Sequence, residues 1–209
     1  MQNTTHAVMS QRIEPNDSPD DFPTPPWATR ALIEHVLGTD NRANQSCLEP
    51  ACGAGHMAKV LHEYFGNVQA SDAYDYGYAP VRDYLATPYE AKAVDWVITN
   101  PPFRLAEQFV LRSLDVSRHG VAMLVRTVFL ESVGRYNRLF SQCPPSIFAQ
   151  FVEEYQWSKG ASIRRRRPPP ATLGWCGIIE PQKKPRLFGF HRVGVYLKEK
   201  WTILVASRV

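Results

Sequence analysis

The chain has 209 residues, 44% hydrophobic and 21% charged, which fits one globular domain with a buried core. No apolar run approaches the roughly 18 residues that cross a bilayer, and no apolar signal peptide is visible, so a membrane protein is excluded and a cytoplasmic one expected. The four scattered cysteines form no CxxC pair and no zinc-type grouping with histidine, so we expect no metal site.

The net charge of +4 is unevenly distributed. Residues 181–209 carry seven Lys and Arg against one acid, and a separate basic run lies at 164–167. Because phosphate neutralisation supplies most non-specific affinity for nucleic acid, concentrated basic charge suggests a polyanionic partner. A solubilising loop and tail would show the same charge. The residues expected to bind nucleic acid are Arg164, Arg165, Arg166, Arg167, Lys183 and Lys184.

Residues 1–21 are polar and are expected to be a disordered lead-in. From residue 23 to about 181, short apolar runs alternate with helical patterns, which is typical of a parallel sheet with crossover helices. The expected helices are 25–36, 56–65, 105–116 and 131–140. The expected strands are 46–49, 68–71, 93–99, 120–125, 147–152 and 172–179, and the tail could add one or two more within 194–206. Together they predict a doubly wound α/β domain.

A glycine-containing turn at 48–55, Leu-Glu-Pro-Ala-Cys-Gly-Ala-Gly, joins the first expected strand to a helix. Gly53 and Gly55 let the backbone turn tightly and approach a ligand at the carboxyl edge of the sheet, where α/β domains bind ligands. The third glycine of the dinucleotide fingerprint is missing, which argues against nicotinamide or flavin. A tight turn without any ligand also needs glycines, so this turn alone leaves cofactor binding open.

Two acidic residues follow this turn. Asp72 ends the next expected strand, where a carboxylate can accept hydrogen bonds from both hydroxyls of a ribose. A turn or helix-cap aspartate would look the same in the sequence. Asp83 could contact an adenine amino group, although an aspartate in a polar loop needs no ligand to explain it.

The segment 95–103, Asp-Trp-Val-Ile-Thr-Asn-Pro-Pro-Phe, carries the most specific chemical signal. The two prolines fix the backbone, so the Asn100 amide oxygen and the Pro101 carbonyl can converge on one donor. Accepting both N–H protons of an amino group conjugated to a heteroaromatic ring restores the nucleophilicity of its nitrogen. Phe103 offers a face for a base that has left its duplex. The alternative is a structural turn with a buried phenylalanine.

The order of these segments resembles the class I S-adenosylmethionine-dependent methyltransferases. Within that class it is similar to the adenine N(6)-specific DNA methyltransferases with the Asn-Pro-Pro-Phe motif, of the small phage or prophage type. The resemblance covers residues 22–180 and implies a Rossmann-like, doubly wound fold. In that fold a seven-stranded, mostly parallel sheet ends in an antiparallel C-terminal hairpin, which would be formed by 147–152 and 172–179.

The resemblance also implies the site and its cofactor, S-adenosyl-L-methionine. Glu49 would lie near the methionine amino group, Asp72 at the ribose and Asp83 at the cofactor adenine. The implied cofactor-binding residues are Thr24, Pro25, Glu49, Ala51, Gly53, Gly55, Asp72 and Asp83. The implied catalytic residues are Asn100, Pro101, Pro102 and Phe103.

We therefore expect a methyltransferase domain at 22–180, a basic extension at 181–209, and direct methyl transfer to the exocyclic amino group of adenine in DNA. The same chemistry on RNA or on a protein glutamine, and an inactive nucleic-acid-binding relative, remain alternatives. No large target-recognition domain is visible, so target specificity could be short, relaxed or absent. Neither a target sequence nor an oligomeric state follows from the residues.

Overall fold

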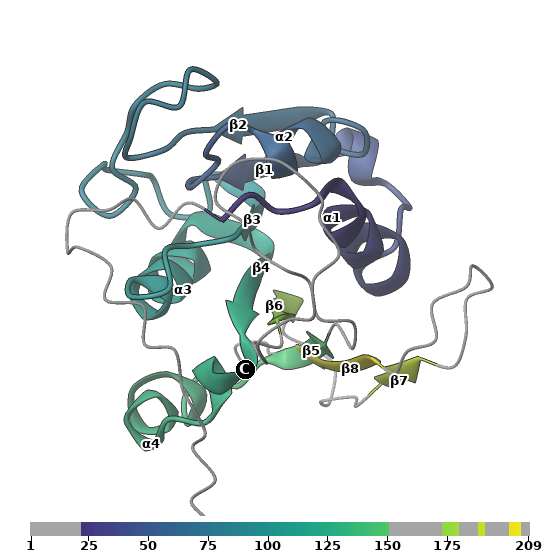
Figure 1. The fold of residues 1–209 in the computed structure, drawn as a ribbon, viewed down its shortest axis with the longest axis vertical. Coiled ribbons are helices and arrows are strands. Elements are labelled where there is room, and N and C mark those ends of the chain that lie inside the picture. Colours follow the sequence, from purple (N-terminus) through teal and green to yellow (C-terminus); the bar gives the residue numbers. More distant parts are fainter. Residues whose placement is uncertain (1–21, 151–172, 180–187, 191–200, 206–209) are drawn as a thin grey trace, which may run out of the picture.

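Four parallel strands form the centre of the fold, in the order β2-β1-β3-β4 (Figure 1). This computed structural model describes residues 22–150, 173–179, 188–190 and 201–205. The central strands are β1 Ser46–Glu49, β2 Asn67–Ala70, β3 Val94–Thr99 and β4 Ser117–Arg126. β1 is followed along the chain by its parallel neighbour β2, the chain then returns past β1 to β3, and β3 is followed by its parallel neighbour β4. This order confirms the expected methyltransferase-like α/β fold with a parallel sheet.

Further strands continue the sheet beyond β4 in the order β6-β5-β8-β7. They are β5 Ser146–Gln150, β6 Leu173–Ile179, β7 Phe188–Phe190 and β8 Trp201–Val205. β6 runs antiparallel to both β4 and β5. The segments that link these strands lie outside the described residues, so the seven-stranded arrangement with a closing hairpin stays a prediction.

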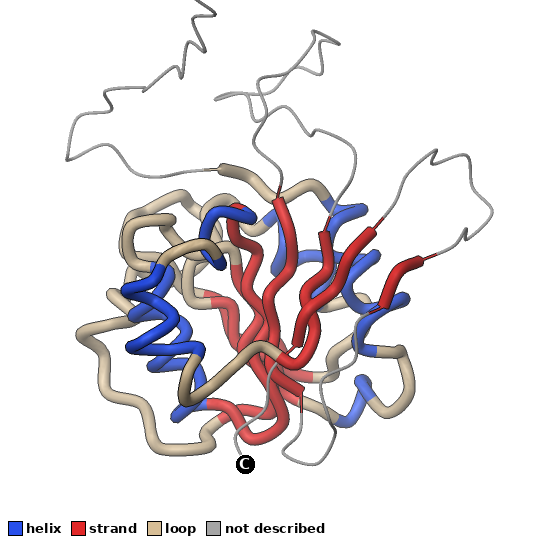
Figure 2. The backbone as a smooth tube through the Cα atoms, turned by 90° about the horizontal axis from the view of Figure 1, so that it is seen from below, coloured by secondary structure: helices blue, strands red, loops and turns tan. Residues whose placement is uncertain are grey.

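Helices cover both faces of the sheet (Figure 2). The main ones are α1 Pro26–Leu32, continued by a π-turn at Ile33–Leu37, then α2 His56–Leu61 and α3 Ala106–Val116. Short turns of helix lie at Arg42–Asn44, Thr127–Leu130, Val133–Arg135 (α4) and Tyr136–Phe140. No helix in the described part is long and apolar enough to span a bilayer.

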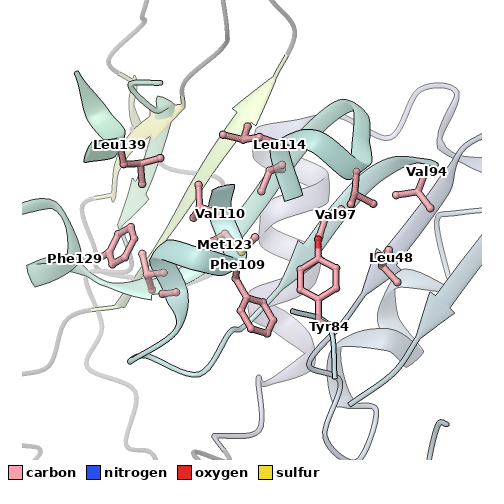
Figure 3. Close-up of a cluster of buried hydrophobic side chains, with 14 residues drawn as sticks. Leu48, Tyr84, Val94, Val97, Phe109, Val110, Leu114, Met123, Phe129 and Leu139 are labelled. Atoms are coloured by element: carbon pink, nitrogen blue, oxygen red, sulfur yellow. The ribbon is translucent and has the colours of Figure 1, made fainter. Parts of the chain in front are cut away.

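Alternating side chains of the central strands divide the core into two clusters. On β4, Ala122 and Leu124 face the cluster formed with α1 and α2. Met123 and Val125 face the opposite cluster, formed with α3 and drawn in Figure 3. A buried parallel strand needs apolar residues on both faces, which explains why β3 and the second half of β4 are almost continuously hydrophobic in the sequence.

The expected elements up to residue 125 are confirmed with small shifts of their ends. The helix expected at 131–140 is present from Val133 to Phe140, where α4 continues directly into a π-turn. Gly134 lies inside α4, although a glycine within a helix costs about 1 kcal/mol relative to alanine. Residues 1–21, the basic run at 164–167 and Lys183 with Lys184 lie outside the described residues, so the predictions made for them stay predictions.

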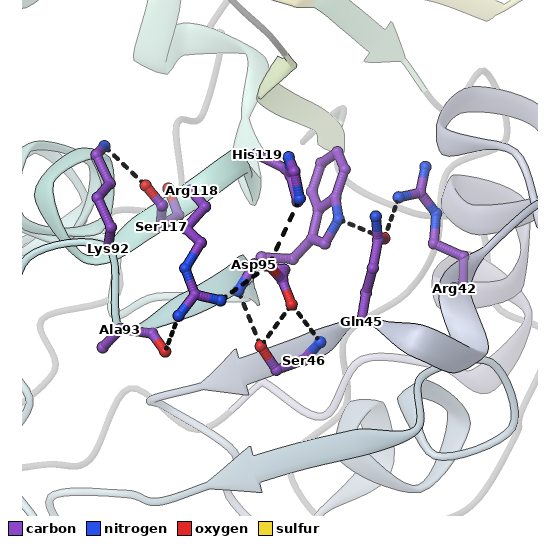
Figure 4. A network of polar contacts seen from close by, with 10 residues as sticks. Arg42, Gln45, Ser46, Lys92, Ala93, Asp95, Ser117, Arg118 and His119 are labelled. Carbon is purple, nitrogen blue, oxygen red and sulfur yellow. Dashed lines mark hydrogen bonds and ion pairs between the residues drawn. The ribbon is translucent and has the colours of Figure 1, made fainter.

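A polar network joins the amino ends of β1, β3 and β4 (Figure 4). The Asp95 carboxylate accepts hydrogen bonds from the backbone N–H and the hydroxyl of Ser46, both at 2.8 Å. Its other oxygen pairs with Arg118 at 3.1 Å and lies 3.5 Å from His119. Burial alone would raise the pKa of Asp95, but the bonds from Ser46 and Arg118 lower it. The network therefore fixes the starts of neighbouring strands.

Candidate active site

A cavity of about 440 Å³ lies at the carboxyl ends of β1 and β3. This is the edge at which open α/β sheets bind ligands, because the crossover loops diverge there. Its lining includes these residues predicted from the sequence: Thr24, Glu49, Ala51, Gly53, Asp72, Asp83, Asn100 and Pro102. Residues from the amino-terminal segment, the glycine turn, the end of β2 and the end of β3 are thus brought together.

The Asn100 side chain is held in one orientation at this cavity. Its Nδ2 donates hydrogen bonds to the backbone oxygen of Phe22 at 2.9 Å and to Thr24 Oγ1 at 3.2 Å. The remaining polar atom, Oδ1, is buried and has no partner among the described residues. An amide whose nitrogen is anchored on the protein presents its oxygen as an acceptor for a donor from outside the protein.

Glu49 ends β1 as a buried carboxyl group in the lining, with only 1% of its surface exposed. Its Oε2 has no partner in the described part of the chain. Burial, and next the negative charge of Asp72, raise the pKa of Glu49 well above 4.5. An unpaired buried oxygen is costly, so the site suits a ligand that brings a donor, and a positively charged donor would restore the carboxylate.

Asp72 lies close to the end of β2 and is fixed by the backbone around it. One carboxylate oxygen accepts from Gly53 N at 2.8 Å and the other from Tyr74 N at 3.0 Å. Gly53 has a φ of 51°, in the left-handed region that favours glycine. Each oxygen keeps a lone pair, so a fixed Asp72 can still accept hydroxyl protons from a ligand.

Gly55 serves a different purpose from Gly53. It lies outside the cavity lining, with a φ of 79°. A Cβ at this position would lie 2.5 Å from ring carbons of Tyr78. The second glycine therefore allows a loop aromatic to pack against the turn, and nothing in the geometry brings it to a ligand.

Asp83 lines the cavity but is exposed, and its carboxylate has local partners. Oδ1 accepts from Leu85 N at 2.8 Å and Ala86 N at 3.3 Å. Such bonds stabilise a turn without a ligand. Asp83 therefore stabilises its own loop, as an aspartate in a polar loop can do without a ligand, and it also lines the cavity.

The other predicted residues lie beside the cavity rather than in its lining. Pro25 is the N-cap residue of α1, and Pro101 is buried behind Asn100. The Phe103 ring is stacked with Phe22 at 5.2 Å between centroids, and the Arg126 guanidinium lies over it at 4.3 Å. A base could stack on Phe103 only if one of these partners shifted.

The sequence reasoning missed several aromatic and basic residues of the lining, and one contact. Tyr74, Tyr76, Tyr84 and Arg104 all line the cavity. The run of tyrosines directly after Asp72 was a usable signal, because loops at this edge of the sheet carry ligand contacts. The hydrogen bond from Asn100 to Thr24 spans 76 residues and has no local signature. No group of side chains in the described ranges could hold a metal ion.

No protein-family model matches the sequence, and a search of curated proteins found no significant match. Solved structures do match. A protein from Pyrococcus horikoshii assigned as an RNA methyltransferase superposes with a TM-score of 0.57 at 16% identity, covering 75% of this chain and 86% of that one. A protein from Vibrio vulnificus assigned as a modification subunit of a type I restriction enzyme gives 0.54 at 17% identity, covering 75% and 44%. At such low identity the likeness concerns the fold: this chain has the α/β fold of these methyltransferases.

Proposed function

We propose that the protein is an S-adenosylmethionine-dependent methyltransferase that modifies the exocyclic amino group of adenine in DNA. The observation that carries the proposal is the anchored amide of Asn100, a residue of the cavity lining whose side-chain oxygen is buried without a partner in the described part of the chain. Few structural roles require an acceptor held this way at the carboxyl edge of a sheet. The fold shared with known methyltransferases supports the methyl-transfer part of the proposal.

The chain's residues fit the proposed cofactor. The unpaired Glu49 oxygen suits the ammonium group of its methionine part, and the fixed Asp72 carboxylate suits ribose hydroxyls. Tyr74 and Tyr76 add aromatic surface to the same cavity, which suits a purine ring. When bound, this cofactor supplies a methyl group on a cationic sulfur, already activated for transfer.

The chain's own part in the reaction is positioning. Asn100 Oδ1 accepts a hydrogen bond from one N–H of the target amino group, and the Pro101 carbonyl accepts one from the other. This draws the nitrogen lone pair out of the ring and aims it toward the transferred carbon. The C–S bond breaks as the new C–N bond forms, and the cationic nitrogen then releases one of its protons to solvent. The transferred group needs no further activation, so orientation and charge stabilisation are sufficient and no general base with a tuned pKa is required. Thr24 keeps the amide in this orientation.

The cofactor and the substrate class can be tested in one experiment. The full chain is incubated with cofactor carrying a labelled methyl group and, separately, with DNA, RNA or protein pools, followed by mass spectrometry of modified bases and residues. N(6)-methyladenine in DNA is the expected product. Label in RNA or on glutamine would replace the substrate assignment, and no label in any pool would overturn the proposed activity.

The role of Asn100 needs its own variant. Asn100→Ala should lower the rate of transfer by at least about 100-fold, since it removes a positioned group acting in the transition state. Cofactor affinity should change little, because Glu49 and Asp72 are retained. Asn67→Ala, an exposed asparagine at the start of β2, is the matched control and should retain full activity. Equal activity of the two variants would remove Asn100 from the mechanism.

A further inference from the structure

The segment 126–138, which begins at the last residue of β4, contacts Phe103 of the Asn-Pro-Pro-Phe motif at one end and α3 at the other. At its start, the Arg126 guanidinium lies over the Phe103 ring. At its end, Arg138 forms a bidentate pair with Glu107 in the first turn of α3, at 2.7 and 2.9 Å. Between these points Phe129 is buried in the core cluster shown in Figure 3. The segment is therefore a fixed part of the surface next to the cavity.

Large apolar side chains are exposed along this segment. Val133 is 75% exposed, Tyr136 59% and Val128 57%. All three lie within a stretch of nine residues. Phe129 in the same stretch is buried in the core, so these side chains are exposed even though the segment packs against the core. A concentration of exposed apolar and aromatic groups in a short segment marks a contact surface more often than a solvated one.

Arginines are interleaved with these apolar groups and are held in place by rings. Arg126 is exposed, and none of the ion pairs in the described part of the chain includes it. Arg135 lies over the Phe129 ring at 4.6 Å and donates to the Phe129 backbone oxygen at 2.8 Å. A guanidinium held through its flat face loses little entropy when its N–H edge binds a phosphate.

The opposite border of the cavity has the opposite charge. Residues 72–90 carry four acids and one arginine, Arg82, whereas residues 126–138 carry one acid and three arginines, of which Arg138 is paired with Glu107. A polyanion at the cavity is repelled from the first border and attracted to the second. A cationic cofactor experiences the reverse preference.

We propose that the surface of 126–136 is where a nucleic-acid strand lies while its target base enters the cavity, with Arg126 on a backbone phosphate and Tyr136 against a base or sugar. Aromatic groups between cations are what single-stranded nucleic acid requires, because every base offers a face for stacking. This inference rests on the proposed function for the identity of the reaction. It stands apart from the basic run at 164–167, since it uses only residues that the structure describes.

The test compares Arg126→Gln, Tyr136→Ala and the control Arg82→Gln in the full-length chain. Arg82 is exposed on the acidic border, so its substitution removes the same charge from the other side of the cavity. Binding of fluorescein-labelled DNA of mixed sequence, as a single strand and as a duplex, is measured by anisotropy over a range of salt concentrations. Methyl transfer and cofactor affinity are measured on the same samples, and thermal unfolding verifies that each variant is folded.

Arg126→Gln should weaken DNA binding about tenfold. The slope of the logarithm of affinity against the logarithm of salt concentration should decrease by about the amount expected for one phosphate contact. Tyr136→Ala should weaken binding by a similar factor with an unchanged salt slope. Arg82→Gln should bind as well as the parent or better, and all three should keep cofactor affinity. If the parent methylates DNA and Arg126→Gln binds it like Arg82→Gln, this inference is wrong and the proposed function stands. If the parent binds DNA through these residues but transfers no methyl group, the proposed function fails instead; a parent that binds no DNA would refute both.

Discussion

The two ends of β1 and β3 have contrasting polar chemistry. At the amino ends, the Asp95 carboxylate is paired through both oxygens with Ser46 and Arg118 (Figure 4). At the carboxyl ends a few residues away, Glu49 Oε2 and Asn100 Oδ1 are buried without a partner in the described part of the chain. The same two strands thus carry a satisfied end and an unsatisfied one.

The difference separates stability from binding within one element. A buried acceptor without a donor costs about 1–3 kcal/mol, whereas a paired charged group stabilises the fold. The amino ends therefore contribute to folding, and the carboxyl ends hold acceptors whose donors have to come from a ligand. Substitutions at the amino ends should consequently change folding stability, and substitutions at the carboxyl ends should change ligand binding.

Glu49→Gln should have the largest effect on binding. The variant keeps the shape of the side chain but cannot become negative, so a ligand ammonium group loses its charged partner. Hydrogen bonds to charged groups contribute about 1.5–3 kcal/mol, which predicts a roughly 30-fold weaker affinity for S-adenosylmethionine by calorimetry. Folding stability should not fall, because the buried carboxyl is already neutral at low pH. An unchanged affinity would mean that Glu49 is not part of the cofactor site.

Asp95→Asn is the matched change at the opposite end and should do the reverse. It removes the charge that pairs with Arg118 while leaving an acceptor for Ser46. We expect a loss of about 1.5 kcal/mol in unfolding free energy, or roughly 3–6 °C in the thermal midpoint of a chain of this length. Cofactor affinity should remain that of the parent. A binding defect in this variant would contradict the separation of the two ends.

Thr24→Val should have a smaller effect, seen mainly in the rate of transfer. It removes the hydroxyl that accepts a hydrogen bond from Asn100 Nδ2, while the Phe22 carbonyl continues to hold the amide. One neutral hydrogen bond is worth about 1 kcal/mol, so we expect a roughly fivefold lower kcat. Thr29→Val is the control, since Thr29 is fully buried and its hydroxyl has no partner in the described residues. Equal rates for both variants would show that Thr24 does not orient Asn100.

The pH dependence of stability should separate the two ends as well. The raised pKa of Glu49 means that its contribution is present below pH 4.5 and is lost as the pH rises through the raised value. The lowered pKa of Asp95 means that its contribution is present above pH 3.8 and is lost as the pH falls. In denaturant unfolding, the stability of Glu49→Gln relative to the parent should therefore increase toward alkaline pH. The loss of stability in Asp95→Asn should become smaller at acid pH. If the free energies of unfolding of all three proteins changed with pH in the same way, both assignments would be wrong.

Much of the central fold could be predicted from the sequence because buried parallel strands are short, apolar and bounded by Gly, Pro and Asp. The strand Ser46–Glu49 was located at both ends, and α3 to within one residue. The helix expected at 131–140 was located to within two residues of its start, but its change to a π-turn at Tyr136 could not be foreseen. Local patterns indicate where a helix lies, but they do not reveal which hydrogen-bonding pattern it adopts.

The candidate site was predictable in composition but not in its internal contacts. The glycine turn, Asp72 and Asn100 are recognisable because each lies where a strand ends. The contact between Thr24 and Asn100 could not be predicted, since the two are 76 residues apart. The stacking of Phe103 with Phe22 and Arg126 was likewise hidden, because it depends on how three separate segments meet.

The dependence of Asn100 on residues near the start of the domain also affects how the protein becomes active. Closing a loop of 78 residues carries an entropic penalty that is recovered only after the sheet has formed. The strands can therefore assemble before the amide acquires its orientation. Undocking of Phe22 and Thr24 alone would release that orientation and leave the sheet intact, so the catalytic centre is expected to be the last part to form and the first to be lost.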